Sequence, residues 1–226
     1  MMGVSRQIWK TALAVAIVGA LALPAVATAQ DQVKVSDAGQ FVRIGQNDEG
    51  YVVLGYETAN YSVKNTWMLL EVAMTTVNKH DATITRGDIA IKTPDGKFIL
   101  LATQKAFSKG FEDLRPMEAR ANDQHQSLNY LPREANHPCT ISFFASTSGG
   151  PGQSIAYDQF SLTPQSACVG RLYFQIPDGI QYGDYALFVK FPSEVEVPFT
   201  IMTKEQAKAW EKNWKQESKK AKEQKK

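Results

Sequence analysis

Cys139 and Cys168 are the two residues of this sequence that could form a covalent cross-link. The chain has no other cysteine and no Cys-x-x-Cys pair, so it lacks the spacing of a redox motif or a zinc site. Because thiols outside the cytoplasm are usually oxidised, we predict a Cys139–Cys168 disulfide. In the chain-entropy model such a bridge stabilises a fold by roughly 3.5 kcal/mol. Two free buried thiols are the alternative.

The polar residues form no recognisable catalytic pattern. The histidines do not stand in a zinc-binding spacing, and they are His80, His125 and His137. The glycine-rich segment 148–152 lacks the G-x-S-x-G arrangement of a serine hydrolase. Acids at alternate positions of a strand, such as Glu194 and Glu196, usually lie on a solvated face. We therefore predict no catalytic residue, no metal site and no cofactor.

The C-terminal segment 203–226 is basic, with nine lysines against four glutamates. Thr203 and Gln206 predict a helix that begins with a capping box. Ala207, Trp210 and Trp214 recur on one face of that helix, which could dock on the rest of the protein. Alternatively the helix contacts anionic lipid, a cell-wall polymer or a partner protein. The residues of that second interpretation are Trp210, Trp214, Lys208, Lys212 and Lys215.

Residues 1–29 have the pattern of a cleaved signal peptide. Arg6 and Lys10 precede an uncharged apolar run at 11–23, and Ala27-Thr28-Ala29 supplies a small-x-small cleavage site. The apolar run is shorter than the roughly 20 residues of a membrane span. We therefore expect a mature chain that begins at Gln30 and lies in the periplasm or outside the cell. No cysteine stands near the cleavage site, so a lipid anchor is not expected.

The charge of the chain is unevenly distributed. Residues 30–202 contain 14 basic and 19 acidic side chains, a net charge of −5, whereas the tail from Thr203 carries +5. An acidic body does not favour nucleic acid as a partner. Hydrophobic residues make up 43% of the sequence, which excludes a disordered chain and is enough for one domain with its own core.

A period of two residues, typical of β-strands, dominates the segment 30–202. In 67–78 one face carries Met68, Leu70, Val72 and Met74, and Glu71, Ala73 and Thr75 lie on a face expected to be solvated, although Trp67 and Leu69 are apolar. Further strands are expected at 40–44, 51–57, 140–144, 168–175, 185–191 and 194–201, and a hairpin at 89–100. The segment 102–137 is a long insert with helical or irregular stretches at 103–111 and 115–121. We predict an all-β immunoglobulin-like β-sandwich with this insert and a C-terminal amphipathic helix.

Two parts of the chain resemble the telokin-like immunoglobulin domains of secreted bacterial proteins. They are Trp67–Asn78 with the Asp95-Gly96 hairpin that follows, and Gly170–Pro177 with Tyr185–Val189. The resemblance covers about half of the mature chain. It implies an extracytoplasmic binding or structural module without catalytic residues. The insert at 102–137 departs from the family pattern, which leaves the order of the strands open.

These observations predict an exported, non-catalytic binding or scaffold module of the cell envelope, whose partner is an unknown protein or an envelope polymer. The first alternative is an enzyme with its site in the insert, which would require several titratable side chains to converge in a cleft. The candidates are Glu112, Asp113, Arg115 and His125. The second alternative is a binder of anionic lipid or cell-wall polymer that acts through the C-terminal tail.

Overall fold

The computed structural model describes residues 33–124, 126–145 and 155–223. The predicted signal peptide, His125 and the glycine-rich segment 148–152 lie outside the described residues. The chain divides into two units, Met1–Gln30 and Asp31–Lys226, and the described helices and strands belong to the second. Among the described helices, none is both long and apolar enough to cross a membrane.

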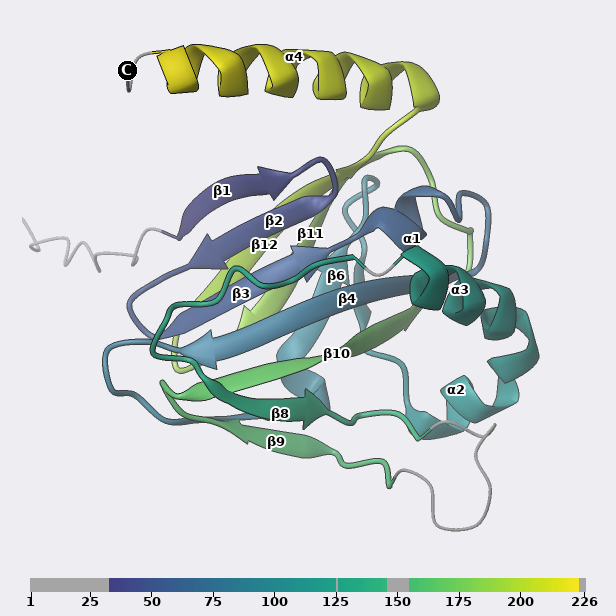
Figure 1. Cartoon of the computed structure of the whole chain (residues 1–226). Helices are drawn as coiled ribbons and strands as arrows, with labels where there is room; N and C mark the ends of the chain where they lie inside the picture. Colours follow the sequence, from purple (N-terminus) through teal and green to yellow (C-terminus); the bar gives the residue numbers. More distant parts are fainter. Residues whose placement is uncertain (1–32, 125, 146–154, 224–226) are drawn as a thin grey trace, which may run out of the picture. The chain divides into compact units, whose positions relative to one another are not determined.

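The largest sheet has six strands in the order β1-β2-β3-β4-β10-β8 (Figure 1). These strands are β1 (Lys34–Gly39), β2 (Val42–Gln46), β3 (Gly50–Gly55), β4 (Trp67–Thr76), β10 (Ser166–Gln175) and β8 (His137–Ile141). β10 runs antiparallel to β4 but parallel to β8, so the sheet is mixed.

A four-stranded sheet has the order β12-β11-β6-β7, and β5 pairs with β9 in a separate two-stranded sheet. Their bounds are β12 (Glu194–Ile201), β11 (Gly183–Lys190), β6 (Ile89–Lys92), β7 (Phe98–Leu100), β5 (Ala82–Thr85) and β9 (Gln159–Leu162). The helices are α1 (Glu57–Asn60), α2 (Gln104–Lys109), α3 (Phe111–Gln124), α4 (Lys204–Glu223) and a 3-10 turn at Arg86–Asp88. The predicted strands and the hairpin at 89–100 are therefore present, most with their ends shifted by a few residues.

The main core contains one face of β4 together with inward side chains of the four-stranded sheet. Met68, Leu70, Val72 and Met74 are fully buried, as the alternation of the sequence predicts. They belong to one apolar cluster with Ile89, Ile91, Leu187, Val189, Val195 and Val197. Burying apolar side chains on both sides of this interface supplies the dominant driving force for folding.

The second face of β4 is also buried, and for this reason the all-β prediction is wrong. Trp67 and Leu69 of this face, together with Tyr173 of the neighbouring strand β10, pack against α2 and α3. The residues of this second apolar cluster on the helices are Phe107, Leu114, Met117 and Ala121. At the corner between the helices, a side chain on Gly110 would come within 2.5 Å of the Trp67 ring, so only glycine allows this approach. The described residues are mainly strand, but they also include four α-helices. The insert is a helical layer of the fold and not an addition to an immunoglobulin-like sandwich.

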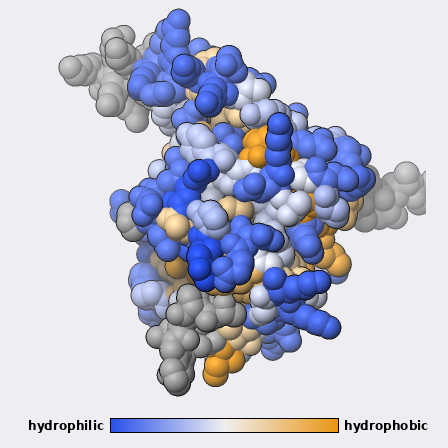
Figure 2. Space-filling view, turned by 90° about the vertical axis from the view of Figure 1, so that its right-hand side faces the viewer, coloured by the Kyte–Doolittle hydropathy of each residue, from blue (hydrophilic) through white to orange (hydrophobic). Residues whose placement is uncertain are grey.

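The outer surface of this helical layer is polar. Figure 2 looks onto the flank of the molecule that carries α2 and α3, and shows a mostly hydrophilic surface with small separate apolar patches. In α3 the buried residues are Leu114, Met117 and Ala121, at spacings of three and four, and most other positions are charged or polar. The helix therefore turns one apolar stripe toward the sheet.

The predicted disulfide is confirmed. Cys139 of β8 and Cys168 of β10 are direct neighbours in the parallel strand pair, with their Cα atoms 4.3 Å apart. Cys168 is buried and Cys139 is half-buried. The bond joins the edge strand β8 to the interior of the sheet and closes the chain between residues 139 and 168.

Replacing both cysteines, Cys139→Ser with Cys168→Ser, should lower the free energy of unfolding by about 3 to 4 kcal/mol, because the unfolded chain regains the freedom of this loop. Urea unfolding of the oxidised wild type and the double variant measures the difference. Reducing agent should destabilise the wild type and leave the variant unchanged. Equal stability of the two oxidised proteins would show that the bridge adds nothing to the fold.

Candidate ligand-binding groove

A hollow of about 730 Å³ lies between α3 and the strands β8 and β10. One part of its wall is apolar and another part is polar. The apolar part is made by Phe107, Phe111, Ile141, Phe144 and Val169, and the polar part by Arg115, Glu118, Asn122 and Arg171. Such a combination of an apolar surface with a few polar groups is typical of sites for organic ligands.

Arg171 is the centre of the polar part. Its guanidinium pairs with the Glu118 carboxylate, donates to Asn122 Oδ1 at 2.8 Å, and lies with Nε 3.5 Å from Glu71 Oε1. The Tyr173 hydroxyl also donates to Glu118. These contacts connect α3 to β10 and β4, so they fix the wall of the hollow.

The sequence brings these residues together through two periodicities. Arg171 lies directly opposite Glu71 in the antiparallel β4–β10 pair, and Tyr173 follows Arg171 on the same face. On α3, Arg115, Glu118 and Asn122 are spaced by three and four residues and therefore line one side of the helix.

A second hollow of about 400 Å³ adjoins the first. The two share Val169, Gly170 and Arg171 in their linings. The second is bounded by Glu71 and by the segment 126–129, which packs over β3 and β4 through Leu128. We refer to the two adjoining hollows as the Arg171 groove.

Glu71 is the carboxylate of this groove whose negative charge is least neutralised by a nearby cation. Its side chain is only 15% exposed, and Arg171, the cation with which it pairs among the described residues, also pairs with Glu118. Burial raises the pKa of the Glu71 carboxyl, although Arg171 acts in the opposite direction. A further positive charge near Glu71 would therefore be favourable.

Glu71 and Arg171 were not among the candidate residues of the sequence analysis. Each is a single charged residue inside an otherwise apolar strand, WMLLEVAM for Glu71 and VGRLYF for Arg171. A charge in such a run requires a partner when both faces of the strand are buried. A lone charge in an apolar strand thus indicates an ion pair, but it does not indicate that α3 supplies Glu118 and Asn122 as further partners of Arg171.

The capping box predicted for the C-terminal helix is confirmed: the Gln206 amide donates to Thr203 Oγ1 at 3.3 Å, and Gln206 Oε1 accepts from the Thr203 amide at 2.8 Å. Ala207 and Trp210 pack against the main core, and Gln40 Nε2 donates to the Ala207 carbonyl at 2.6 Å. The first turns of α4 are therefore docked on the body.

The predicted tail residues lie on two sides of α4. Trp214 stacks on Trp210 with ring centroids 5.1 Å apart and is 37% exposed. Four exposed lysines instead follow one another at spacings of four, four and three residues, which in a helix of 3.6 residues per turn places them within an arc of about 80°. We call these residues the lysine ridge, and they are Lys204, Lys208, Lys212 and Lys215.

The three candidate catalytic residues of the insert that the structure describes do not converge in a cleft. Arg115 Nη2 pairs with Glu112 Oε1 at 2.9 Å, and both side chains are exposed. Of the described candidates Glu112, Asp113 and Arg115, the groove lining includes Arg115 alone.

No family model, curated protein or solved structure matches the chain. The resemblance to telokin-like immunoglobulin domains therefore stays a prediction, and the immunoglobulin-like sandwich that it implied differs from the mixed sheet with a helical layer.

The substitution Glu71→Gln should stabilise the protein at neutral pH. A carboxyl whose folded-state pKa is raised contributes stability at low pH and loses it as the pH rises through that pKa. The advantage of the variant should therefore shrink toward about pH 4, near the ordinary pKa of glutamate. Urea unfolding of both proteins at the two pH values measures this. Glu196→Gln, at an exposed position of β12, is the control for the loss of one carboxylate. A Glu71→Gln protein less stable than wild type at neutral pH would contradict the assignment.

Proposed function

We propose that this protein is an exported binding module without catalytic chemistry, and that the Arg171 groove binds a cationic amphipathic ligand. Such a ligand carries an ammonium or guanidinium group beside an apolar group. The observation that carries the proposal is the position of Glu71, a mostly buried carboxylate that faces an open hollow. Within the described part of the chain it pairs with Arg171, which it shares with Glu118.

The dimensions of the groove support a ligand of this kind. Its two hollows, of about 730 and 400 Å³, fall in the range of roughly 300 to 1,000 Å³ that is usual for organic ligands. An apolar group fits against Phe111, Phe144 and Val169. A cationic group in the adjoining hollow would lie near Glu71, with side-chain oxygens available from Ser127 and Asn129.

The electrostatics favour a cation over an anion. Glu71 and Glu118 carry two negative charges against the one positive charge of Arg171. The guanidinium of Arg171 already contacts both carboxylates and Asn122. Arg115 is paired with Glu112. The acidic body of residues 30–202, with a net charge of −5, would add long-range attraction for a cation.

The ion-pair cluster favours binding over catalysis. Glu118 already accepts from Arg171 and Tyr173, so its carboxylate is held in a structural network that joins α3 to the sheet. The expected location outside the cytoplasm agrees with the confirmed disulfide, because such bonds persist in oxidising compartments.

Three probes of equal shape and different charge test the proposed ligand class: 4-phenylbutylamine, 4-phenylbutanol and 4-phenylbutyrate. We expect the amine to bind about tenfold more tightly than the alcohol, and the carboxylate more weakly than both, because only the amine compensates Glu71. Calorimetric or NMR titration of the mature protein measures the affinities. The amide signals of Val169, Gly170 and Arg171 should shift on addition of the amine.

Two variants locate the effect. Glu71→Gln should reduce binding of the amine by about tenfold and leave binding of the alcohol unchanged. Glu196→Gln removes an equal charge from an exposed position of β12, outside the groove lining, and should change neither. Equal affinities for the three probes, or binding that moves signals elsewhere in the protein, would refute the groove as a site for cations.

The lysine ridge supports a second function, attachment to an anionic polymer of the envelope. The apolar residues Ala207 and Trp210 pack against the body, whereas the four ridge lysines are exposed. Lys204 and Lys208 also line a hollow that α4 forms with the body, and Lys215 pairs with Glu211. The exposed part of the ridge therefore presents charge rather than an apolar surface. Insertion of a helix into lipid needs an exposed apolar face. The geometry therefore favours a polymer over the interior of a membrane.

Replacing the lysine ridge by glutamine at all four positions should lower the salt concentration that elutes the protein from a sulfated-polysaccharide column, because fewer charges contact the polymer. Replacing four exposed lysines elsewhere, Lys34, Lys64, Lys79 and Lys190, changes the net charge equally and should have a smaller effect. Equal elution of the two variants would show that only total charge matters. A blue shift of tryptophan fluorescence on phosphatidylglycerol vesicles would instead indicate lipid insertion.

A further inference from the structure

β7 is an edge strand with a free backbone. Its hydrogen-bonded neighbour is β6, and the bonds Leu101 N–H to Ile89 O at 3.1 Å and Thr93 N–H to Lys97 O at 2.9 Å flank this pair. Because hydrogen-bonded positions alternate along an antiparallel pair, the backbone groups of Phe98 and Leu100 point away from β6. Within the described ranges, no further hydrogen bond reaches these groups. The N–H of Ala102, two residues on, donates to the Tyr173 carbonyl of β10 at 2.9 Å, so the free stretch of this edge ends at Leu100.

The side chains at this edge are apolar and exposed. Phe98 is 63% and Leu100 is 64% exposed, and the Phe98 ring lies 5.3 Å from that of Phe188 on β11. Proteins normally protect an apolar edge strand with charges, a bulge or a covering segment, since a free edge readily pairs with another strand. β7 has an apolar surface beside an open backbone.

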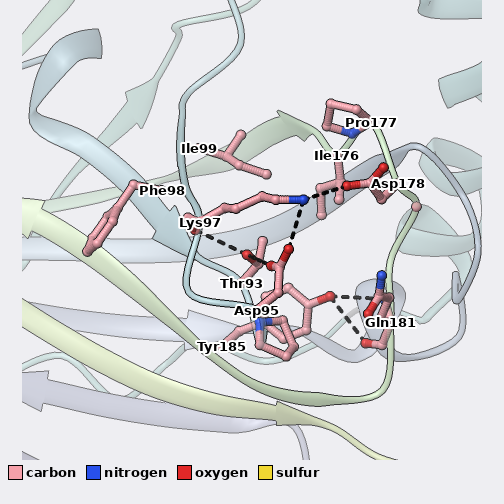
Figure 3. A pocket seen from close by; sticks show the side chains of 12 residues that line it. Thr93, Asp95, Lys97, Phe98, Ile99, Ile176, Pro177, Asp178, Gln181 and Tyr185 are labelled. Atoms are coloured by element: carbon pink, nitrogen blue, oxygen red, sulfur yellow. Dashed lines mark hydrogen bonds and ion pairs between the residues drawn. The ribbon is translucent and has the colours of Figure 1, made fainter.

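A hollow of about 420 Å³ lies under this edge, between the turn 93–97 and the segment 176–181. Figure 3 shows Lys97 reaching across toward Asp178, with Ile99 and Ile176 above it and Tyr185 below, whereas the Phe98 ring points the other way. The Tyr185 hydroxyl is held by the backbone of Gln181. We call this space the Lys97 hollow, and much of its lining is apolar.

The rim of the Lys97 hollow is acidic. Lys97 Nζ lies 2.8 Å from both Asp95 Oδ2 and Asp178 Oδ2, so two carboxylates face one ammonium. Hydrogen bonds from Lys97 and Thr93 lower the pKa of Asp95 to about 2, and those to Asp178 and Asp95 raise the pKa of Lys97. Asp95 and Lys97 therefore stay charged at neutral pH. With two carboxylates against one ammonium, the rim has a surplus negative charge that a basic side chain could compensate.

We propose that β7 and the Lys97 hollow form a β-strand addition site for an extended peptide of a partner protein. The peptide would pair its backbone with Phe98 and Leu100. Side chains on one face of the added strand would enter the Lys97 hollow, and a basic residue would lie beside Asp95 and Asp178. This site is separate from the Arg171 groove and does not depend on the function proposed for that groove.

Four hexapeptides test the proposal, acetyl-Thr-Xaa-Thr-Xaa-Thr-Arg-amide with Xaa as valine, isoleucine, leucine or phenylalanine. We expect at least one to bind the full mature chain and to shift the NMR signals of Phe98 and Leu100. Methylation of the alternate peptide nitrogens that face β7 keeps the side chains but removes main-chain donors. It should abolish binding, because strand addition depends on those donors.

Two variants at one position separate backbone from side chain. Leu100→Pro removes an N–H that β6 does not use and should weaken binding more than tenfold, since proline is tolerated at a strand edge. Leu100→Thr keeps the N–H and should stay within about threefold of wild type. Circular dichroism checks that both variants fold.

Charge gives a third test. Asp178→Asn should weaken the arginine peptide severalfold and leave a glutamine-ended version unchanged. The proposal is overturned if no peptide binds, or if the methylated peptides bind as well as their parents. It is also overturned if the protein is a dimer that Leu100→Pro dissociates, because the edge then belongs to a second copy of the chain.

Discussion

The structure depends on one constraint: both faces of β4 are apolar, and both have to be removed from water. The four-stranded sheet covers one face through Met68, Leu70, Val72 and Met74. The helical layer covers part of the other through Trp67 and Leu69. Because Glu71 lies in the middle of this second face, burial of the face forces a carboxylate into the interior, where it requires Arg171. The polar centre of the groove therefore follows from the way the sheet is buried.

Much of the strand content could be predicted from the sequence, and the layer structure could not. Alternation located β4, β10, β11 and β12, because a strand with one buried face has a period of two. It failed for the second face of β4, where Trp67 and Leu69 required a cover that a two-sheet sandwich does not provide. The covering residues of α3 lie about 50 positions along the chain, and local pattern carries no information on such a contact.

The disulfide could likewise be predicted from the sequence, whereas the groove could not. Cysteine count and the expected compartment were sufficient for the Cys139–Cys168 bridge, since only one pairing is possible. The groove needs Glu71, Glu118 and Arg171 from three elements, and no spacing in the sequence relates them. On α4, the lysine spacing of four, four and three was visible in the sequence and identifies a ridge distinct from the tryptophan face.

The central claim is that Glu71 is an under-compensated carboxylate that a ligand cation can reach. Carbon-13 NMR titration of the Glu71 carboxyl, with and without saturating 4-phenylbutylamine, tests this most directly. The account predicts a pKa above the ordinary value for glutamate in the free protein and a clear decrease when the amine is bound, because the added positive charge favours the ionised form. An ordinary pKa in the free protein, or a raised pKa that the bound amine leaves unchanged, would contradict it.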